Sequence, residues 1–309
     1  MHVTIIFAMN KARVACIPNF SEGRRLTVID AITDSIAKIP KATILDRHID
    51  AHHNRTVITY VGSPASVLQA AFQAVSTAST LIDMEQHNGE HPRIGATDVV
   101  PFVPLNGTAM KTCVQMAVEL GSKVGDELGI PVYLYEHAAI KSARRNLANV
   151  RRGEYEKLRN SISIDPKRYP DFGPKKLGSP GATAIGARTP LIAFNVNLTT
   201  NDVLIAQNIA KTIRQSSGGL ECVKSIGIMV DGLAQVSTNI TDHTKTPVIE
   251  VVDAIRSEAA NYGVDIDHSE IVGLIPQDAL EKIERWHLPE NLELSNYILE
   301  QRLSASLQS

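Results

Sequence analysis

Cysteine is scarce in this chain of 309 residues. Its three cysteines, Cys16, Cys113 and Cys222, are far apart, and no two of them form the Cys-x-x-Cys spacing of a thiolate zinc site. Each lies among apolar residues, a setting typical of buried thiols that stay reduced in a cytoplasmic protein. We therefore expect no disulfide framework, no cysteine-based metal site and a cytoplasmic location.

Neither sign of charge is in excess. The chain has 31 lysines and arginines against 33 aspartates and glutamates, for a formal net charge of −2 at pH 7. Binding to a nucleic-acid backbone needs a one-sided basic surface, so we expect no nucleic-acid partner.

No uninterrupted apolar run is long enough to cross a bilayer, which takes about 20 residues in a helix. The first nine residues, which end at Met9, are apolar but are not preceded by lysine or arginine, so they do not match a signal peptide. We expect no membrane association. This segment is an extra turn or strand, or it follows an upstream start codon with Met9 as the true start.

Three common motifs are missing. The sequence has no Gly-x-Gly-x-x-Gly after its first strand, no phosphate-loop lysine motif and no Gly-x-Ser-x-Gly. These absences disfavour nicotinamide cofactors, nucleoside triphosphates and a serine nucleophile elbow.

Hydrophobic periodicity predicts two α/β blocks. In the first block we expect strands at 13–18, 42–45, 56–61, 99–103 and 131–135 and helices at 25–38, 63–81 and 108–128. In the second we expect strands at 191–198, 224–230, 234–240 and 270–275, helices at 202–215 and 247–262, and a helical tail at 289–307.

The second block has the order β-α-β-β-α-β, which is typical of a ferredoxin-like fold, and Asp231-Gly232 is a strong hairpin signal within it. The first block has a similar order with insertions. The predicted fold class is α/β (α+β), with two ferredoxin-like-related subdomains at residues 1–186 and 187–309. Between them, residues 141–186 are basic and interrupted by prolines and glycines, so we expect irregular structure there.

The densest polar segment is 86–98, which includes His87, Glu90, His91, Arg93 and Asp98. It follows a predicted helix and precedes a predicted strand, and such loops often carry catalytic groups. A histidine there can move a proton near neutral pH, and an arginine can hold a carboxylate. His91 is therefore a candidate acid/base, although a loop histidine bonded to backbone is an equally simple interpretation.

A second histidine cluster includes His48, Asp50, His52 and His53 and is followed by Asn54 and Arg55. Together with a histidine from 86–98 it could hold zinc, but no established zinc spacing is present. We therefore predict no metal. The alternative is that Asn54 and Arg55 bind substrate while the histidines line the same cleft.

Asparagines on predicted strands form a third polar set. Asn195 and Asn197 point the same way along one strand, and Asn239 lies on another. A buried asparagine must be hydrogen-bonded, so these residues either pair across the sheet or line a ligand cavity.

Further segments with distinctive sequences follow one another from about Val14 to about Leu280: 16–23, 54–56, 61–62, 81–84, 89–93 with 95, 132–135, 151 with 153–155, 170–174, 181–183, 186–188, 191–195 with 197, 233–239 and 271–274. In this order they resemble the formiminotransferase family, which includes glutamate formimidoyltransferase and the transferase domain of formimidoyltransferase-cyclodeaminase. The ordered set is highly specific, although no single segment would be.

The resemblance implies two α/β subdomains with a folate cleft or tunnel between them. It also implies transfer of a formimidoyl group between N5 of tetrahydrofolate and the amine of L-glutamate, with His91 as the catalytic residue. The implied folate-binding segment is Gly173, Pro174, Lys175, Lys176, Leu177, Gly178, Ser179, Pro180 and Gly181. The predicted substrate-binding residues are Asn19, Asn54, Arg55, Arg93, Asn195 and Asn239.

The chemistry agrees with these residues. An attacking amine must lose a proton and the departing pterin nitrogen must gain one, and one histidine can serve both. Arg55 and Arg93 are candidate partners for the glutamate carboxylates, and Lys175 and Lys176 for the folate tail. Where the mammalian pattern has an additional carboxylate, this chain has Arg47 and His48; we assign no catalytic aspartate there, although Asp50 could substitute.

Two other functions are compatible with the same residues. The donor could be 5-formyltetrahydrofolate, which would make the protein a glutamate formyltransferase, or the protein could be a non-catalytic folate-binding module. Tetrahydrofolate is expected as the substrate carrier with no metal. The expected partners are folate, L-glutamate, a second copy of the chain in a homodimer, and a separate cyclodeaminase.

Overall fold

The computed structural model describes residues 12–89, 91–105 and 107–306 of the chain, so the predictions for the first nine residues, for Glu90 and for the last residues of the tail lie outside the described residues. The structure separates into two compact units that divide between Arg188 and Thr189.

The first unit is built on a seven-stranded sheet. Its strands are β1 (Arg13–Cys16), β2 (Asn19–Phe20), β3 (Ala42–Asp50), β4 (Arg55–Gly62), β5 (Thr97–Leu105), β6 (Val132–Glu136) and β7 (Thr183–Ala187). β1 and β2 both lie between β4 and β5, so the order across the sheet is β3, β4, β1 with β2, β5, β7, β6. The pairs among β1 to β5 are antiparallel, whereas β7 runs parallel to β5 and β6.

Three helices cover one face of this sheet: α2 (Leu26–Ala37), α3 (Pro64–Leu81) and α4 (Met110–Glu127). Their spacing of apolar residues supplies one buried stripe each, as with Ile29, Ile32 and Ile36 of α2. Ser63 caps α3 through its side chain and Pro64 begins the helix, as predicted. The core that results includes Ile58 and Phe102 from the sheet.

The opposite face carries a smaller core over β5, β6 and β7. Tyr133 and Tyr135 point into it, while their neighbours Val132 and Leu134 point into the larger core, because side chains alternate along a strand. The helices α5 (Leu147–Arg151) and α6 (Glu154–Ser161) supply its other wall.

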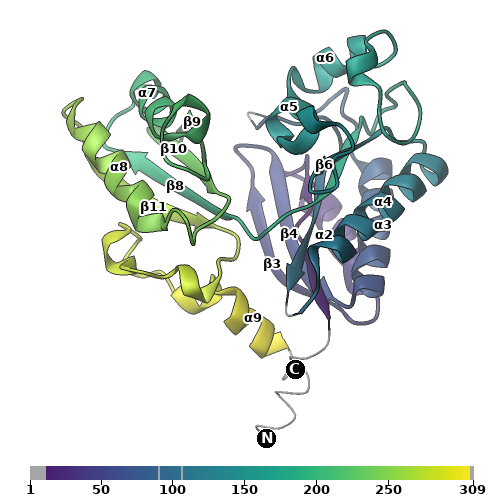
Figure 1. Cartoon of the computed structure of the whole chain (residues 1–309), viewed down its shortest axis with the longest axis horizontal. Helices are drawn as coiled ribbons and strands as arrows, with labels where there is room; N and C mark the ends of the chain where they lie inside the picture. Colours follow the sequence, from purple (N-terminus) through teal and green to yellow (C-terminus); the bar gives the residue numbers. More distant parts are fainter. Residues whose placement is uncertain (1–11, 90, 106, 307–309) are drawn as a thin grey trace, which may run out of the picture. The chain divides into compact units, whose positions relative to one another are not determined.

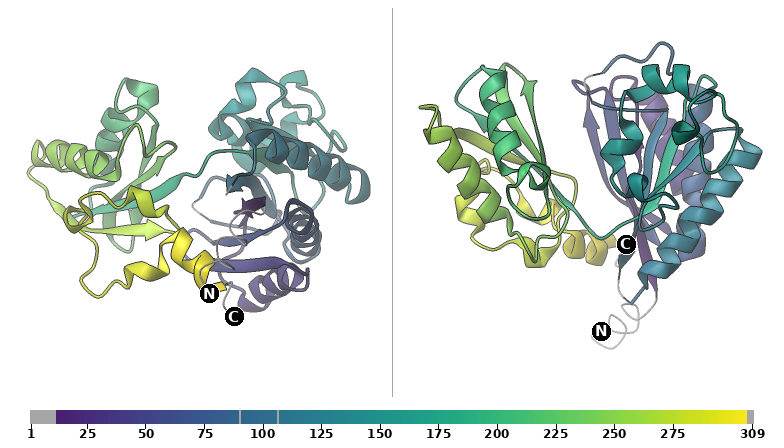
Figure 2. Two further views of the ribbon diagram at one scale, coloured as in Figure 1. Left: turned by 60° about the horizontal axis from the view of Figure 1, so that its bottom comes forward. Right: turned by 45° about the horizontal axis from the view of Figure 1, so that its top comes forward.

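The second unit is a four-stranded antiparallel sheet in the order β11, β8, β10, β9. Its elements are β8 (Ile192–Leu198), α7 (Val203–Ile213), β9 (Val223–Val230), β10 (Leu233–Ile240), α8 (Val248–Ala260) and β11 (Ile266–Val272). α7 and α8 pack on one face, as Figures 1 and 2 show. The order of elements and of strands is ferredoxin-like, which confirms the predicted fold class.

Short 3₁₀ turns complete the chain: η1 (Ser142–Arg145), η2 (Pro166–Arg168), η3 (Gln215–Ser217), η4 (Gln277–Ala279), η5 (Ile283–Arg285) and η6 (Leu294–Asn296). Of the predicted helical tail, only α9 (Leu299–Ser306) is α-helical. The residues between Pro289 and α9 form turns and the short η6.

Segment 141–186 is more ordered than predicted. It contains α5, α6 and the start of β7, and β7 adds a strand to the interior of the first sheet. Several of its basic side chains serve the fold: Arg144 pairs with Asp171 at 2.6 Å, and Arg168 donates to the carbonyls of Asn149 and Val150. Part of the local positive charge is therefore structural.

β3 also extends further than predicted, from Ala42 to Asp50, so the second histidine cluster lies on a strand and its turn. A register shift between Ile44 and Asp46 keeps the strand paired with β4 beyond the apolar part that the sequence pattern detected.

Candidate functional site

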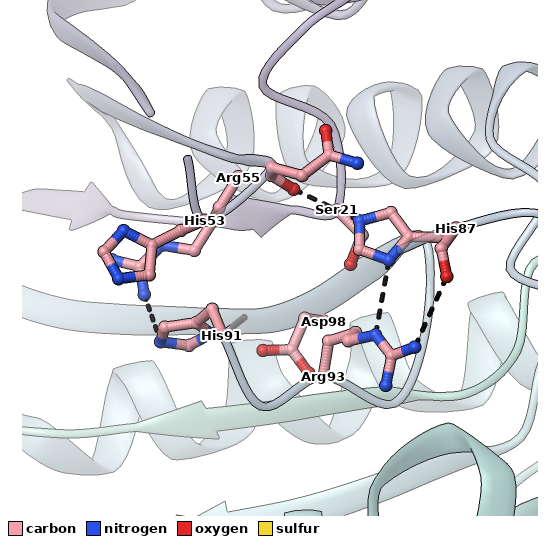
Figure 3. A pocket seen from close by; sticks show the side chains of 8 residues that line it. Ser21, His53, Arg55, His87, His91, Arg93 and Asp98 are labelled. Carbon is pink, nitrogen blue, oxygen red and sulfur yellow. Dashed lines mark hydrogen bonds between the residues drawn. The ribbon is translucent and has the colours of Figure 1, made fainter. Parts of the chain in front are cut away.

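A small pocket in the first unit collects eight polar side chains. They come from three parts of the chain that are distant in sequence, and Figure 3 shows them: Ser21, His53, Asn54, Arg55, His87, His91, Arg93 and Asp98. The pocket thus joins the two histidine clusters that the sequence separates.

The β3–β4 hairpin brings the second cluster to the pocket. Its turn at 51–54 ends with Asn54 in the left-handed region at φ 49°, which asparagine tolerates better than most residues. The Asn54 side chain accepts from the Gly23 N–H at 2.9 Å and donates to the Asn88 carbonyl at 2.9 Å. Asn54 therefore ties together three loops, a role that is structural in this geometry.

Gly23 is required by this arrangement. A Cβ on Gly23 would lie 2.1 Å from the Asp50 carbonyl oxygen and 2.6 Å from the Arg55 nitrogen, both backbone atoms. Only glycine allows the loop after β2 to lie this close to the hairpin.

Arg55 contacts the predicted catalytic histidine directly. Its guanidinium donates from Nη1 to Nε2 of His91, and Nδ1 of His91 is buried without a hydrogen-bond partner among the described residues. Burial, followed by the positive charges of Arg55 and Arg151, lowers the pKa of His91 well below its usual 6.5. His91 is therefore a neutral imidazole at pH 7.

Burial and the nearby Arg151 also lower the pKa of Arg55, to about 10, so its guanidinium remains charged at pH 7. Arg151, at the end of α5, forms an ion pair with Asp98, and Asp98 also accepts from the Ile94 N–H at 2.9 Å. Arg55 thus lies within the electrostatic influence of one arginine, Arg151, and of two carboxylates, Asp98 and Asp50.

Arg93 is engaged elsewhere. Its guanidinium pairs with Glu154 at 2.9 Å and Glu156 at 2.6 Å, both on α6, and its Nε donates to Nδ1 of His87 at 3.3 Å. The Arg93 guanidinium is therefore already paired with two carboxylates, and these ion pairs anchor the His91 loop to α6.

His53 lies at the same pocket and is bonded to Asp50. Its ring centroid is 6.2 Å from that of His91, with the rings nearly perpendicular at 82°.

The predicted folate-binding segment lies against the loop that carries His91. The Ser179 carbonyl accepts from Met84 and the Pro180 carbonyl from Ala96, each at 2.8 Å, and Ala182 donates to the Ile94 carbonyl at 2.9 Å. Gly173 to Lys176 are exposed, and the Lys175 ammonium lies 3.7 Å from the Tyr169 ring centroid.

The three remaining predicted residues lie outside the pocket. Asn19, on β2, donates to the Ile17 carbonyl at 3.0 Å. In the second unit, Asn195 donates to Glu270 at 2.8 Å within a network that includes Gln235, and Asn239 is exposed on β10. Asn195, Gln235 and Asn239 share the sheet face opposite the apolar core, by their strand register.

Residue-level reasoning missed Arg151 and Ser21. Arg151 is 53 residues from Asp98 in sequence, and its signals were its place in a basic segment and in one of the distinctive segments, neither of which indicates a partner. Ser21 donates to the Gly95 carbonyl at 2.8 Å and thereby ties the loop after β2 to the loop that carries His91.

Within the described residues, no group of three histidine, cysteine, aspartate or glutamate side chains is placed to hold a metal ion. No helix in that part of the chain is both long and apolar enough to cross a membrane.

Comparison with known proteins assigns the family. Residues 13–188 match the formiminotransferase domain, N-terminal subdomain, and residues 193–305 match the formiminotransferase domain. The chain therefore belongs to the formiminotransferase family, as its sequence predicted.

Curated relatives match over nearly the full length. The chain is 46% identical to a glutamate formimidoyltransferase of Thermoplasma acidophilum, over 94% of this chain and 97% of the relative, and 44% identical to one of Streptococcus pyogenes, over 94% and 98%. It is 43% identical to the formimidoyltransferase-cyclodeaminase of Rattus norvegicus, over 86% of this chain and 51% of that protein.

Proposed function

We propose that this protein is a glutamate formimidoyltransferase, which moves a formimidoyl group between N5 of tetrahydrofolate and the amine of L-glutamate. The observation that carries the proposal is His91, a neutral imidazole that faces a pocket and is bonded to an arginine. The near-full-length similarity to curated glutamate formimidoyltransferases supports the same conclusion.

The proposed reaction needs one proton removed and one supplied. As the attacking nitrogen bonds to the amidine carbon, it loses a proton, and the C=N electron pair moves to the imino nitrogen. When that pair re-forms the double bond, the bond to the departing nitrogen breaks and this nitrogen takes up a proton. A neutral His91 can accept the first proton, and its protonated form can return it to the departing nitrogen.

Arg55 is the favoured partner for a glutamate carboxylate. It lies beside His91, whereas the Arg93 fork already binds two carboxylates of α6. A carboxylate that binds Arg55 would draw the guanidinium away from Nε2 of His91 and free that nitrogen to act as the base.

The folate sits, in this proposal, against the segment from Gly173 to Gly181. Ser179 to Gly181 lie against the His91 loop, and the exposed Lys175 and Lys176 are available to the carboxylates of the folate tail. The pocket itself has room for about one water molecule, so a carboxylate that binds Arg55 must widen it. The remaining predicted substrate-binding residues, Asn19, Asn195 and Asn239, stay a prediction.

A transfer assay with two donors tests the proposal. Purified protein is incubated with glutamate and either 5-formimidoyl- or 5-formyltetrahydrofolate, and formimidoylglutamate or formylglutamate is measured by mass spectrometry. We expect turnover with the formimidoyl donor. Turnover with the formyl donor alone would make it a glutamate formyltransferase, and folate binding without either product would make it a binding module.

The expected partners follow from the same proposal. The name of the rat relative, formimidoyltransferase-cyclodeaminase, joins the two activities, which supports a cyclodeaminase as the functional partner of this chain. With formimidoylglutamate and tetrahydrofolate as substrates, the folate product is 5-formimidoyltetrahydrofolate, and a purified cyclodeaminase should consume it. Light scattering should give the mass of the expected homodimer.

A further inference from the structure

The pair formed by Asp50 and His53 has no role in a reaction that His91 catalyses alone. Asp50 ends β3 and His53 lies in the turn that follows, and the His53 side chain is 15% exposed. Both Asp50 carboxylate oxygens are engaged: Oδ1 accepts from the His53 backbone N–H at 2.8 Å, and Oδ2 accepts from ring nitrogen Nδ1 of His53.

The ring contact exceeds what the turn needs. An aspartate that accepts from the backbone N–H three residues later already stabilises the turn through one oxygen. The second oxygen fixes the orientation of the imidazole and places its hydrogen on Nδ1, so that Nε2 carries the lone pair. The same carboxylate stabilises the positive ring that forms when Nε2 takes a proton, as in other Asp–His pairs of acid/base sites.

The carboxylate itself stays ionised. Burial alone would raise the pKa of Asp50, but the hydrogen bonds from the ring and backbone of His53 outweigh this effect and lower the pKa to about 2. The Asp50 side chain is therefore a carboxylate across the neutral pH range.

His53 and His91 line one pocket from two different loops. Their ring centroids are 6.2 Å apart, and they meet edge to face. The charged and titratable groups around His53 are Asp50, the neighbouring His52 and Arg55, and His91 across the pocket. Nε2 of His91 is occupied by Arg55, whereas Nε2 of His53 makes no hydrogen bond to the described residues.

We propose that His53, positioned by Asp50, is a second proton-transfer residue of the site. The inference rests on the proposed function. His91 takes the proton from the attacking nitrogen as the new C–N bond forms, and protonated His53 gives a proton to the departing nitrogen as the old bond breaks. A proton then passes from His91 to His53, directly or through a water molecule, so the enzyme is unchanged after each turnover.

Two imidazoles can reach the attacking and departing nitrogens more easily than one. The attacking and departing nitrogens lie on different sides of the tetrahedral carbon, and a single ring must turn or move to reach both. Two imidazoles at 6.2 Å can each serve one nitrogen without moving.

Variants of the pair test this role. We expect His53→Gln to lower kcat about 10- to 100-fold with KM for both substrates nearly unchanged, because it removes the proton donor and keeps a polar side chain. His52→Gln is the matched control in the same turn. His52 is exposed and lies outside the pocket, so its variant should turn over as wild type does.

In this proposal Asp50 affects the proton transfer through His53, so the double variant is the sharpest case. Asp50→Asn should lower kcat in part, and Asp50→Asn combined with His53→Gln should be no slower than His53→Gln alone. Full kcat in His53→Gln, a loss confined to KM, or losses that multiply in the double variant would each overturn the proposal.

A measurement that needs no turnover checks the geometry. Long-range ¹H–¹⁵N correlation spectra of the full chain should show His53 with hydrogen on Nδ1, and Asp50→Asn should remove this preference. The transfer assay of wild type separates the two ideas. If wild type transfers no one-carbon group, the proposed function and this inference both fail, whereas wild-type turnover with an unaffected His53→Gln refutes the inference alone.

Discussion

Arg55 has two effects on His91 at the scale of single residues. Its positive charge disfavours protonation of the imidazole, and its Nη1 occupies the lone pair of Nε2. A base is most useful when it is unprotonated at the working pH, so the first effect supports catalysis and the second must be relieved by substrate.

The pH dependence of kcat/KM should reveal the effect of the Arg55 charge on the pKa of His91. Activity requires neutral His91, and its pKa is lowered well below 6.5, so the acidic limb of the wild-type profile should lie below pH 6.5. Arg55→Gln removes one of the groups that lower this pKa, so the limb should move to higher pH, in addition to any rise in KM for glutamate.

Arg47→Gln is the control for this experiment, since Arg47 lies on the same hairpin, is exposed and pairs with Asp30 at 2.5 Å. Its profile should match that of wild type. An acidic limb that stays in place in Arg55→Gln would show that Arg55 does not set the protonation of His91.

Sequence reasoning reached part of this site. His91 and Arg55 were predicted because each lies in a dense polar segment with distinctive neighbours. The pairing of Arg151 with Asp98, and of Arg93 with Glu156, could not be predicted, because each joins residues more than 50 positions apart through tertiary contacts. The spacing of residues along the chain does not show which side chains form ion pairs with distant residues.

At the scale of elements, the folate-binding segment is fixed to the His91 loop by close backbone contact. Gly181 has φ 71°, and a Cβ there would lie 2.5 Å from the Ile94 carbonyl oxygen and 2.8 Å from Gly95 Cα. Gly95 lies equally close, since its own Cβ would be 2.0 Å from the Ala182 carbonyl oxygen. The two loops therefore act as one support for the site.

Gly181→Ala should break this contact. Left-handed backbone and a clash with main-chain atoms together should cost about 1–3 kcal/mol of folding stability and weaken folate binding. Thermal unfolding and folate titration measure the two effects. Gly178→Ala is the control for the unfolding measurement, because its Cβ would meet only Pro180 Cδ, at 3.4 Å. Equal unfolding midpoints for the two variants would show that the Gly181 backbone contact does not stabilise the loop.

Elements differed in how well they could be predicted. The β9–β10 hairpin could be predicted because Asp-Gly favours a tight turn with positive φ at both residues. The structure has these angles, 48° at Asp231 and 83° at Gly232. β7 was missed, because its five residues Thr183–Ala187 include two alanines and a glycine and give little strand signal. Its place between β5 and β6 comes from parallel pairing with distant strands.

At the scale of the whole molecule, each unit has its own hydrophobic core, and the single tryptophan reports on one of them. Trp286 is fully buried in the second unit and meets Phe194 edge to face, with ring centroids 5.5 Å apart. The network of Asn195, Gln235 and Glu270 lies on the other face of the same sheet.

Phe194→Ala should therefore lower the stability of the second unit by about 3–5 kcal/mol, the usual cost of a large cavity in a core. Trp286 fluorescence during urea unfolding measures this directly. Leu204→Ala, on the exposed side of α7, should leave the midpoint nearly unchanged. A Phe194→Ala midpoint equal to that of wild type would show that this contact is not part of a packed core.

The proposed formimidoyl transfer depends on proton transfer by His91. The most direct test is the turnover of His91→Ala in the formimidoyl transfer assay, with folate affinity measured on the same preparation. We predict that turnover falls about 10²- to 10⁴-fold while folate still binds. Turnover equal to that of wild type would contradict the central claim.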